Sequence, residues 1–534
     1  MGFVKRLRCG KGNCEGQPKR IVPVPSFTDK RLDTQMIRFA LLFLFLSTSA
    51  YPVPKPSVLF IAVDDMNDWT STLGGYSGKV HTPNLERLAR LGMTFSNAHT
   101  ASPVCCPSRT AMMLGLRPST TGVYNNGQWW RPHLPDALSL PMHFKRHGYE
   151  TMGAGKIFHH TAGFNPPAQW DDFQRLVFQD DPWFRGHKLN YPWSTPGKYP
   201  KGYPFSGLKG TPHEGDWGVI PGLAEAEYDD SKSVDYAVRA LGKKRDQPFF
   251  LACGIFRPHL PWYAPKKYFD LYPLEKIKLP EIIENDLQDV PLQGIKLSAA
   301  RRNEFLNIKK HGKWKEGIRA YLASISFADA QLGRLLDALE KSAHADNTII
   351  VFWSDHGWHL GEKNHWHKST LWEEATRIPF LFSVPGVTKG GTRCSRPVDT
   401  LCVYPTLVEL CGLKPRKDLD GVSIVPLLKN PEKKWDVPAV TEFKRGQCTV
   451  RSERFRYIRY SDGTEELYDH SKDPNEWTNL AEKESYRKVM DELGRSIPKK
   501  FAPDAPSKGA YQFDHKTYAW THKKTGKITH GAKK

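Results

Sequence analysis

The stretch VLFIAV at residues 58–63 runs directly into Asp64 and Asp65, and it decides the fold of this chain. An unbroken apolar run of this length predicts a strand that is covered on both faces, as in a parallel sheet, with two acids at its carboxyl end. Two similar runs, at 249–255 and 348–353, also lead into polar segments. The chain is therefore expected to place several buried strands side by side in one sheet.

Helical patterns lie between these strands. Leucines recur on one face of 83–91, and apolar residues recur at helical intervals over 319–341. Strands that alternate with helices predict an α/β fold with a large, mostly parallel sheet flanked by helices. The segment 160–235 lacks clear periodicity and is expected to form long loops that line a substrate pocket.

Acidic residues and a histidine follow two of the predicted strands. Asp64 and Asp65 follow the first, and Asp355 and His356 follow the run at 348–353. Ligands of parallel α/β sheets bind beyond the carboxyl ends of the strands, so we expect these side chains to meet there. Oxygen-rich sites favour Ca²⁺ or Mg²⁺, and the single imidazole also leaves Mn²⁺ open.

A second group of chemically active residues begins with CCPSR at residues 105–109. It joins a small nucleophile to a proline-fixed turn and a cation, and Gly115 follows at a short distance. Further along, GAGK ends at Lys156, but its spacing is not that of a phosphate-binding P-loop. Each feature also has an ordinary explanation, since a buried Cys is usually inert and a Lys beside Trp residues often only packs its stem.

Five motifs in this order resemble the type I sulfatases over roughly residues 55–485, and iduronate-2-sulfatase-like enzymes in particular. They are the Asp-Asp pair at 64–65, C-x-P-S-R at 105–109, G-K-x-F-H at 155–159, a basic-Pro-His run at 257–259, and S-D-H-G-W at 354–358 with Lys368 beyond it. The resemblance implies an alkaline-phosphatase-like sulfatase fold with a smaller antiparallel α+β domain at the C-terminal end.

The resemblance also assigns roles. It implies that a maturation enzyme converts Cys105 to formylglycine, and that Cys106 and His160 are ordinary neighbours. One Ca²⁺ ion would be bound by the modified Cys105 together with Asp64, Asp65, Asp355 and His356. The sulfate would be held by Arg109, Lys156 and Lys368.

The implied reaction needs proton transfers as well. The hydrated aldehyde would attack sulfur, and His259 or Lys368 would give a proton to the leaving alcohol. His159 would then remove a proton so that the aldehyde reforms and sulfate leaves. The sequence departs from the family pattern at Leu114 and Leu116, where the maturation enzyme reads the chain, so conversion of Cys105 stays a prediction.

The substrate is inferred from few residues. Arg131, after two tryptophans, and Trp358 could supply a cation and a stacking ring for a sugar carboxylate, which would suit a 2-sulfated uronic acid of a glycosaminoglycan or algal polysaccharide. Packing explains the same aromatic residues. Other readings are a phenolic or choline sulfate, a phosphate or phosphonate monoesterase on the same fold, and a non-catalytic polyanion-binding protein.

Segment boundaries follow from composition. We expect a catalytic domain over 55–430 and a smaller subdomain over 435–500 that contains a hairpin. Residues 36–50 form a secretory signal pattern behind a basic leader at 1–35, which falls away if translation starts at Met36. The alternatives are an uncleaved anchor and a buried helix. The basic tail at 505–534 is expected to be poorly ordered.

Charge and cysteine content bear on partners and compartment. The net charge is +20 and is concentrated at the two ends of the chain, as in solvated tails. We therefore expect a sulfated carbohydrate partner and no nucleic acid, in an exported protein that is periplasmic, secreted or held in a lysosome-like compartment. The pairing of Cys402 with Cys411 and the oligomeric state stay open.

Overall fold

The computed structural model describes residues 55–174, 202–208 and 215–531. The predicted leader at 1–35 and the predicted signal segment at 36–50 lie outside the described residues. Within the described part of the chain, no helix has the length and apolar character needed to cross a membrane.

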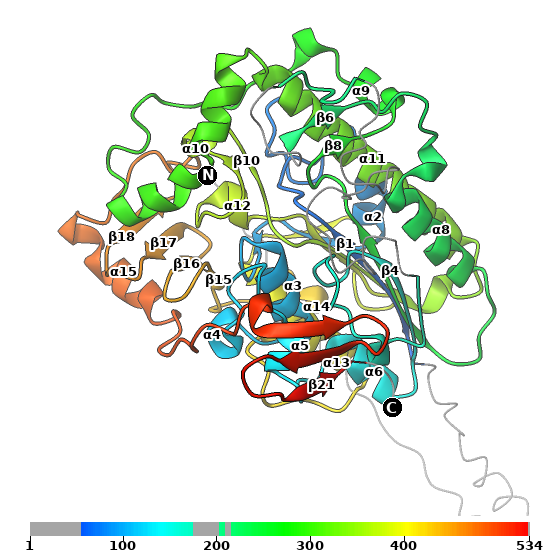
Figure 1. The fold of residues 1–534 in the computed structure, drawn as a ribbon. Coiled ribbons are helices and arrows are strands. Elements are labelled where there is room, and N and C mark those ends of the chain that lie inside the picture. The colour runs from blue at the N-terminus through cyan, green and yellow to red at the C-terminus, as the bar shows by residue number, and fades with distance from the viewer. Residues whose placement is uncertain (1–54, 175–201, 209–214, 532–534) are drawn as a thin grey trace, which may run out of the picture. The chain divides into compact units, whose positions relative to one another are not determined.

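A mixed sheet of eight strands forms the centre of the fold (Figure 1). Its middle strand β1 (Ser57–Val63) lies between β7 (Phe249–Ile255) and β9 (Thr348–Ser354), and both neighbours run parallel to it. The remaining strands, in order outward from β7 and then from β9, are β4 (Glu150–Gly155), β5 (Asp172–Gln174), β12 (Phe380–Ser383), β2 (Met93–Phe95) and β13 (Thr392–Cys394). Only β12 pairs antiparallel with its neighbours, so the prediction of a mostly parallel sheet is confirmed.

The two faces of β1 belong to two different hydrophobic cores. Leu59, Ile61 and Val63 pack in one core with α2 (Pro83–Leu91), α8 (Asp229–Leu241) and α11 (Trp314–Glu340). The alternate residues of the strand pack in the other core with α3 (Cys105–Leu114), α6 (Leu140–Arg146) and α13 (Val403–Leu410). Because side chains alternate along a strand, a strand covered on both faces must be apolar throughout, which explains the run at 58–63.

Shorter elements connect these layers. The long helix α10 (Leu292–Lys310) precedes α11. Besides several 3-10 turns, the short α-helices and strands among the described residues of the catalytic part are β3 (Ala98–His99), α4 (Pro118–Thr121), α5 (Trp130–His133), β6 (Trp217–Gly218), β8 (Trp262–Tyr263), α9 (Lys266–Asp270), β10 (His359–Leu360), β11 (Trp366–His367), α12 (Glu373–Thr376), β14 (Val398–Asp399) and α14 (Val425–Lys429). The predicted loop region at 160–235 contains only short elements before α8 begins, in the part that is described.

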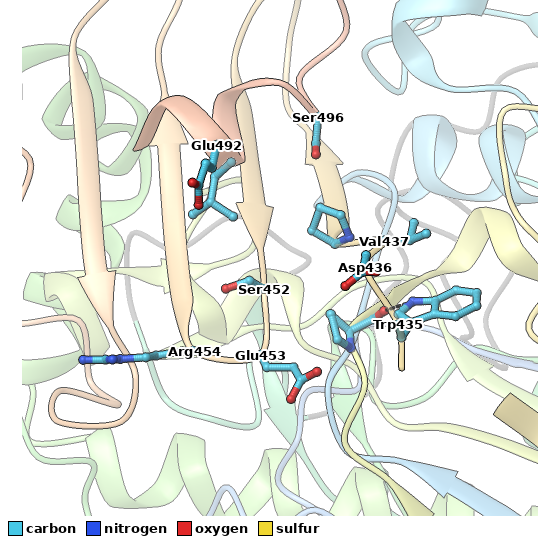
Figure 2. Close-up of a pocket in the computed structure, with 11 residues that line it drawn as sticks. Trp435, Asp436, Val437, Ser452, Glu453, Arg454, Glu492 and Ser496 are labelled. Carbon is cyan, nitrogen blue, oxygen red and sulfur yellow. Dashed lines mark hydrogen bonds between the residues drawn. The ribbon is translucent and has the colours of Figure 1, made fainter. Parts of the chain in front are cut away.

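A four-stranded antiparallel sheet follows the catalytic part of the chain. Its strands are β15 (Ala439–Glu442), β16 (Cys448–Arg451), β17 (Phe455–Arg459) and β18 (Glu465–Asp469), and α15 (Arg487–Gly494) packs on β17. The predicted hairpin is confirmed as β17 and β18. Figure 2 shows a groove beside this subdomain, between α15 and the segment that contains Trp435, and none of the predicted site residues lines it.

The prediction for the C-terminal tail is wrong. Residues 511–530 form a three-stranded antiparallel sheet of β19 (Tyr511–Asp514), β20 (Ala519–His522) and β21 (Ile528–His530). Trp520 is fully buried and lies with Phe513 and Tyr511 against Trp129. The many lysines of this segment led to the prediction of poor order, whereas the aromatic residues between them supply the apolar surface that orders the segment.

Candidate active site

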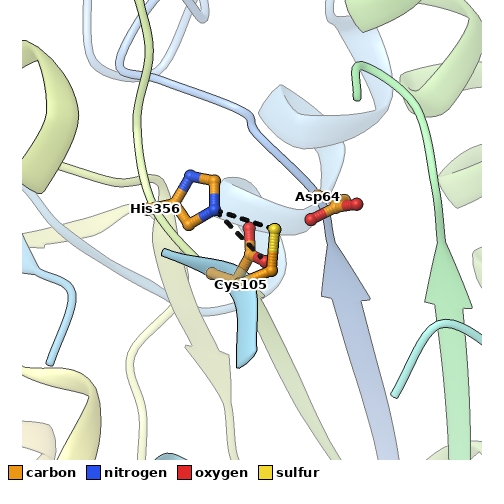
Figure 3. A group of neighbouring side chains, drawn as sticks. Asp64, Cys105 and His356 are labelled. Atoms are coloured by element: carbon orange, nitrogen blue, oxygen red, sulfur yellow. Dashed lines mark hydrogen bonds and ion pairs between the residues drawn. The ribbon is translucent and has the colours of Figure 1, made fainter. Parts of the chain in front are cut away.

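The carboxyl ends of β1 and β9 bring the predicted metal ligands together. Val63 pairs with Ser354 in parallel register, so the residues that follow each strand emerge at the same edge of the sheet. Cys105 is the first residue of α3 and points into this edge. Figure 3 shows His356 and Asp64 on either side of Cys105. The ligand atoms of Asp64, Cys105, Asp355 and His356 all lie within 4.8 Å of one another.

Asp65 enters the same cluster through an unusual backbone conformation. Its φ angle is 62°, in the left-handed region that non-glycine residues seldom adopt. The neighbouring elements hold it there, because its N–H donates to Asp355 Oδ1 at 3.1 Å and its carbonyl accepts from the Tyr321 hydroxyl at 2.7 Å. Such strain persists only where surrounding contacts fix it, and here it turns a second carboxylate toward Cys105.

Arg109 and Lys156 bind the carboxylates of the cluster directly. Arg109 Nε donates to Asp355 Oδ2 at 2.8 Å, and its Nη2 lies 3.2 Å from Asp64 Oδ1. Lys156 pairs with Asp64, and all of these side chains are buried. Burial by itself would raise the pKa of Asp64, but the cations Lys156 and Arg109 lower that pKa well below its ordinary value. The predicted sulfate-binding cations therefore also keep this ligand ionised.

A pair of glycines allows Lys156 to reach the cluster. A Cβ at Gly155 would lie 2.0 Å from the carbonyl oxygen of Gly254, and a Cβ at Gly254 would lie 2.3 Å from the backbone of Lys156. Gly155 also has a φ of +73°, which favours glycine. The close approach of β4 and β7 at this point thus depends on both residues lacking a side chain.

Lys368 contacts the nucleophile position. Its Nζ lies 2.9 Å from Cys105 Sγ and 2.6 Å from Asp65 Oδ1. Burial opposes the charge of Lys368, yet Asp65 and Cys105 raise the pKa of its ammonium. The same Nζ lies 5.5 Å from the centre of the Trp358 ring, which is fully buried. This burial argues against the predicted stacking of Trp358 on a sugar, and the ring supports Lys368 instead.

Two histidines turn a ring nitrogen toward the cluster. His356 Nδ1 donates to the Gly357 carbonyl at 3.1 Å, which leaves the lone pair of Nε2 facing Cys105 Sγ at 3.3 Å. His259 Nδ1 donates to the Leu260 carbonyl in the same way, and its Nε2 lies 3.8 Å from Asp65 Oδ2. Burial lowers the pKa of both imidazoles, so both are neutral near pH 7.

His159 lies beside this group, in line with the predicted G-K-x-F-H motif. Its Nδ1 lies 3.1 Å from the Thr161 hydroxyl, and its ring centre lies 4.5 Å from that of His160. The ring of His160 in turn lies 6.1 Å from that of His259. His160 was expected to be an ordinary neighbour, whereas the structure places it between two predicted proton-transfer residues.

The donor atoms fit a divalent cation. Asp65 Oδ2 is buried and has no hydrogen-bond partner among the described residues, and the pKa of Asp65 is raised to about 8 by burial, which outweighs Lys368. Carboxylates that crowd together at one point with an imidazole lone pair are the ligands that a hard cation requires. Asp64, Asp65, Asp355 and His356 would hold this ion together with the side chain at position 105.

The remaining predicted residues lie outside the cluster. Cys106 Sγ lies 3.5 Å from the Gln128 carbonyl, and burial raises the pKa of its thiol to about 12. Arg131 donates to the Ala137 carbonyl at 3.2 Å, and its guanidinium lies 5.7 Å from the centre of the Trp130 ring. Cys402 and Cys411 are free thiols. The sequence did not indicate that Thr161 contacts His159 and Lys508 contacts Thr161, because neither Thr161 nor Lys508 belongs to a motif.

A nucleophile position at a helix N-terminus, surrounded by fixed cations and metal-ligating acids, defines a hydrolase of anionic esters. Comparison with known proteins identifies which one. Residues 56–413 match the sulfatase family, and residues 361–502 match the C-terminal domain of N-sulphoglucosamine sulphohydrolase. The chain belongs to the sulfatase family and is a sulfuric ester hydrolase.

Individual relatives agree with this assignment. The chain is 40% identical over 468 residues to a sulfatase of Formosa agariphila, which covers 86% of this chain and 90% of the relative. It is 31% identical to human iduronate 2-sulfatase over 67% of this chain and 69% of that protein. It is also 31% identical to the choline-sulfatase of Rhizobium meliloti, over 80% of this chain and 83% of the enzyme.

Solved structures share the fold at lower identity. One, in complex with its substrate D-glucosamine-2-N,6-O-disulfate, superposes with a TM-score of 0.65 at 22% identity and covers 83% of this chain and 96% of its own. The phosphonate monoester hydrolase of Agrobacterium radiobacter gives a TM-score of 0.64 at 20% identity, over 86% of this chain and 98% of its own. Sulfatases generally use formylglycine and a divalent metal ion, which the cluster around Cys105 can accommodate.

Proposed function

We propose that this sulfatase is exported and hydrolyses the sulfate ester of a carbohydrate, a 2-sulfated uronic acid, using Ca²⁺ and a formylglycine made from Cys105. The observation that carries the reaction is the position of Cys105 Sγ, 2.9 Å from Lys368 Nζ and 3.3 Å from His356 Nε2. The likeness to iduronate 2-sulfatase supports the choice of a 2-sulfated uronic acid, and a second relative, an ulvan-active sulfatase that is 28% identical, supports a polysaccharide as the source of the substrate.

The residues around position 105 supply what sulfate transfer requires. Formylglycine at position 105 would supply an oxygen nucleophile, and a divalent cation held by Asp64, Asp65, Asp355 and His356 would lower the pKa of its hydroxyl so that it can react near neutral pH. Arg109, Lys156 and Lys368 are fixed cations in a buried site, so they stabilise charge that develops on sulfate oxygens without having to reorganise.

The hydrogen bonds also divide the proton transfers between side chains. His259 commits its Nδ1 proton to the Leu260 carbonyl, so its Nε2 is an acceptor in the neutral form. Lys368 has ammonium protons directed at Cys105 and Asp65, so it is the better donor to the leaving oxygen. His159 accepts the proton that must be removed for sulfate to leave.

Modification of Cys105 is tested first. Mass spectrometry of the peptide that spans residue 105, taken from protein produced in its native host, should show the aldehyde. An unmodified thiol throughout the sample would end the proposed mechanism and would favour a polyanion-binding protein without catalysis.

The substrate is tested with matched esters. Sulfated mono- and disaccharides that differ only in the position of the sulfate should show the highest kcat/KM for the 2-sulfated uronic acid. Aryl sulfate and aryl phosphate with the same leaving group should favour sulfate. Faster phosphate release by several orders of magnitude would instead identify a phosphate monoesterase on this fold.

The choice of cation is tested by removal and return. Chelation should lower both activity and Tm, because an ion that binds only to the folded protein stabilises the folded state. Ca²⁺ should restore both at lower concentration than Mg²⁺ or Mn²⁺. Equal restoration by all three ions would contradict the assignment of Ca²⁺, though not the presence of a metal site.

A further inference from the structure

The segment that precedes the C-terminal sheet places one lysine near His159. Lys508 precedes β19, and its N–H donates to the Gly127 carbonyl at 2.7 Å. Gln128 fixes the same segment, since its Nε2 donates to the Ala505 carbonyl at 2.8 Å. The family matches end at residue 502, so this lysine lies outside both matched segments.

A continuous series of contacts links Lys508 to the catalytic histidines. Its Nζ donates to the Thr161 hydroxyl at 2.9 Å, and that oxygen lies 3.1 Å from His159 Nδ1. The ring centre of His159 lies 4.5 Å from that of His160, and the ring centre of His160 lies 6.1 Å from that of His259. The series of contacts therefore continues toward Asp65. Lys508 is thus joined through one hydroxyl to His159, the residue predicted to remove a proton during sulfate release.

The surroundings of this ammonium leave its charge unbalanced. It lies 4.5 Å from the centre of the Phe164 ring and 5.9 Å from that of Trp129. No ion pair joins it to a carboxylate among the residues that the structure describes. Burial lowers the pKa of Lys508 to about 8. An ammonium in this position would be stabilised by an anion.

We propose that Lys508 and Thr161 form a subsite that binds a second anionic group of the substrate, a carboxylate or a further sulfate, beside His159. The inference rests on the proposed function in that the substrate is a charged sugar, and it names the residue that recognises the second charge. Aromatic rings on two sides fix the ammonium, and the Thr161 hydroxyl can donate to an anion that the ammonium binds.

The test compares two substrates that differ in one charge. They are a uronic acid 2-sulfate and its carboxyl-reduced counterpart, which keeps the same ring and the same sulfate. For Lys508→Met the ratio of kcat/KM between them should fall about 10- to 100-fold, the effect of one charge-assisted hydrogen bond. Lys508→Arg should recover part of the ratio, and Lys516→Met, at an exposed lysine in the turn between β19 and β20, should leave it as in the wild type.

Other outcomes would overturn the proposal. An equal loss on both substrates would mean that Lys508 only positions His159 or supports the fold, and an unchanged ratio would mean that it binds no anion. A disulfated sugar without a carboxylate, compared with its monosulfated form, distinguishes a second sulfate from a carboxylate as the group recognised.

Failure of the proposed function can be told apart from failure of the subsite. If the wild type cleaves neither sugar, inhibition of aryl sulfate hydrolysis by glucuronate and by glucose is measured instead. Stronger inhibition by glucuronate in the wild type than in Lys508→Met would support the subsite, even though the proposed substrate would be rejected. Equal inhibition of both proteins by glucuronate would overturn the subsite.

Discussion

Two adjacent cysteines with opposite surroundings show how the site depends on single residues. Cys105 contacts Lys368 and His356, whereas Cys106 faces the Gln128 carbonyl in the core. The difference arises because successive residues of a helix point in directions about 100° apart. One thiol therefore enters the polar cluster and the other enters the apolar layer below the sheet.

The first prediction separates the two thiols. Cys105→Ala should abolish turnover of an aryl sulfate, because it removes the only precursor of the nucleophile in the cluster as it is described. Cys106→Ala, the matched control, should keep kcat within about tenfold, at a modest cost in Tm for the small cavity. Steady-state kinetics measures both, and loss of activity in Cys106→Ala with Cys105→Ala active would reverse the assignment.

The second prediction concerns Lys368. Lys368→Met should lower kcat by about 10²- to 10³-fold, because it removes a fixed cation from the place where charge develops. Lys363→Met is the control, since Lys363 is equally buried but pairs with Asp286 away from Cys105. The control should lose stability and keep most of its kcat. Comparable kcat values in the two variants would contradict a catalytic role for Lys368.

At the scale of elements, buried polar contacts join the C-terminal subdomain to the catalytic part. Glu442, at the end of β15, accepts hydrogen bonds from the backbone N–H and the hydroxyl of Ser119 in α4, at 2.8 and 2.9 Å. A second group connects α12 with the same subdomain through Glu373, Arg456 and Glu476. With His470, the two glutamates could in principle bind a metal ion. The guanidinium of Arg456 already pairs with both of their carboxylates.

The third prediction uses the ionisation of Glu442. Burial raises the pKa of this carboxyl from its ordinary 4.5 to about 7. A carboxyl group whose pKa is raised in the folded protein contributes stability that is fully present below pH 4.5 and is lost as the pH rises through about 7. Glu442→Gln cannot ionise, so its free energy of unfolding relative to the wild type should rise by up to about 3 kcal/mol between pH 5 and pH 8.

Thermal or urea unfolding at a series of pH values measures this difference. The matched control is Glu432→Gln, which replaces an exposed glutamate and should show no such trend. A Glu442→Gln variant whose relative stability falls as the pH rises would show that the carboxylate is needed in its charged form, as the partner of Arg117.

At the scale of the whole molecule, the C-terminal sheet closes over the loop that contains Trp129. Trp520 lies with its ring 6.4 Å from that of Trp129, and the Tyr518 hydroxyl accepts from the N–H of Asn165 at 3.1 Å. The last segment of the chain therefore packs on the loops that carry His159 and Thr161. It contributes both apolar burial and the position of Lys508.

The fourth prediction tests this docking. Trp520→Ala should lower the free energy of unfolding by about 3–5 kcal/mol, because it leaves a large cavity beside Trp129. Ile528→Ala, an apolar residue of the same sheet that is 53% exposed, should cost much less. Urea unfolding compares the two. Equal effects would indicate that the sheet contributes little to the stability of the folded protein.

Local patterns predicted the architecture well because a strand that is buried on both faces has a continuous run of apolar residues. The apolar runs of β1, β7 and β9 predicted strands covered on both faces, and the hairpin expected within residues 435–500 is that of β17 and β18. Patterns were less informative where composition and packing conflict. The lysines of the tail concealed Trp520, and the position of Trp358 next to a motif suggested exposure for a ring that is buried.

By itself, the sequence determined three buried strands of the central sheet, the alternation of strands with helices, and the residue types of the site, since hydrophobic periodicity and short motifs are local properties. Only the tertiary structure decided which side chains meet. The parallel register of Val63 with Ser354 brings together acids that are 290 residues apart, and the start of α3 places Cys105 beside them. The docking of Lys508 beside His159 likewise depends on contacts between distant segments, which no local pattern encodes.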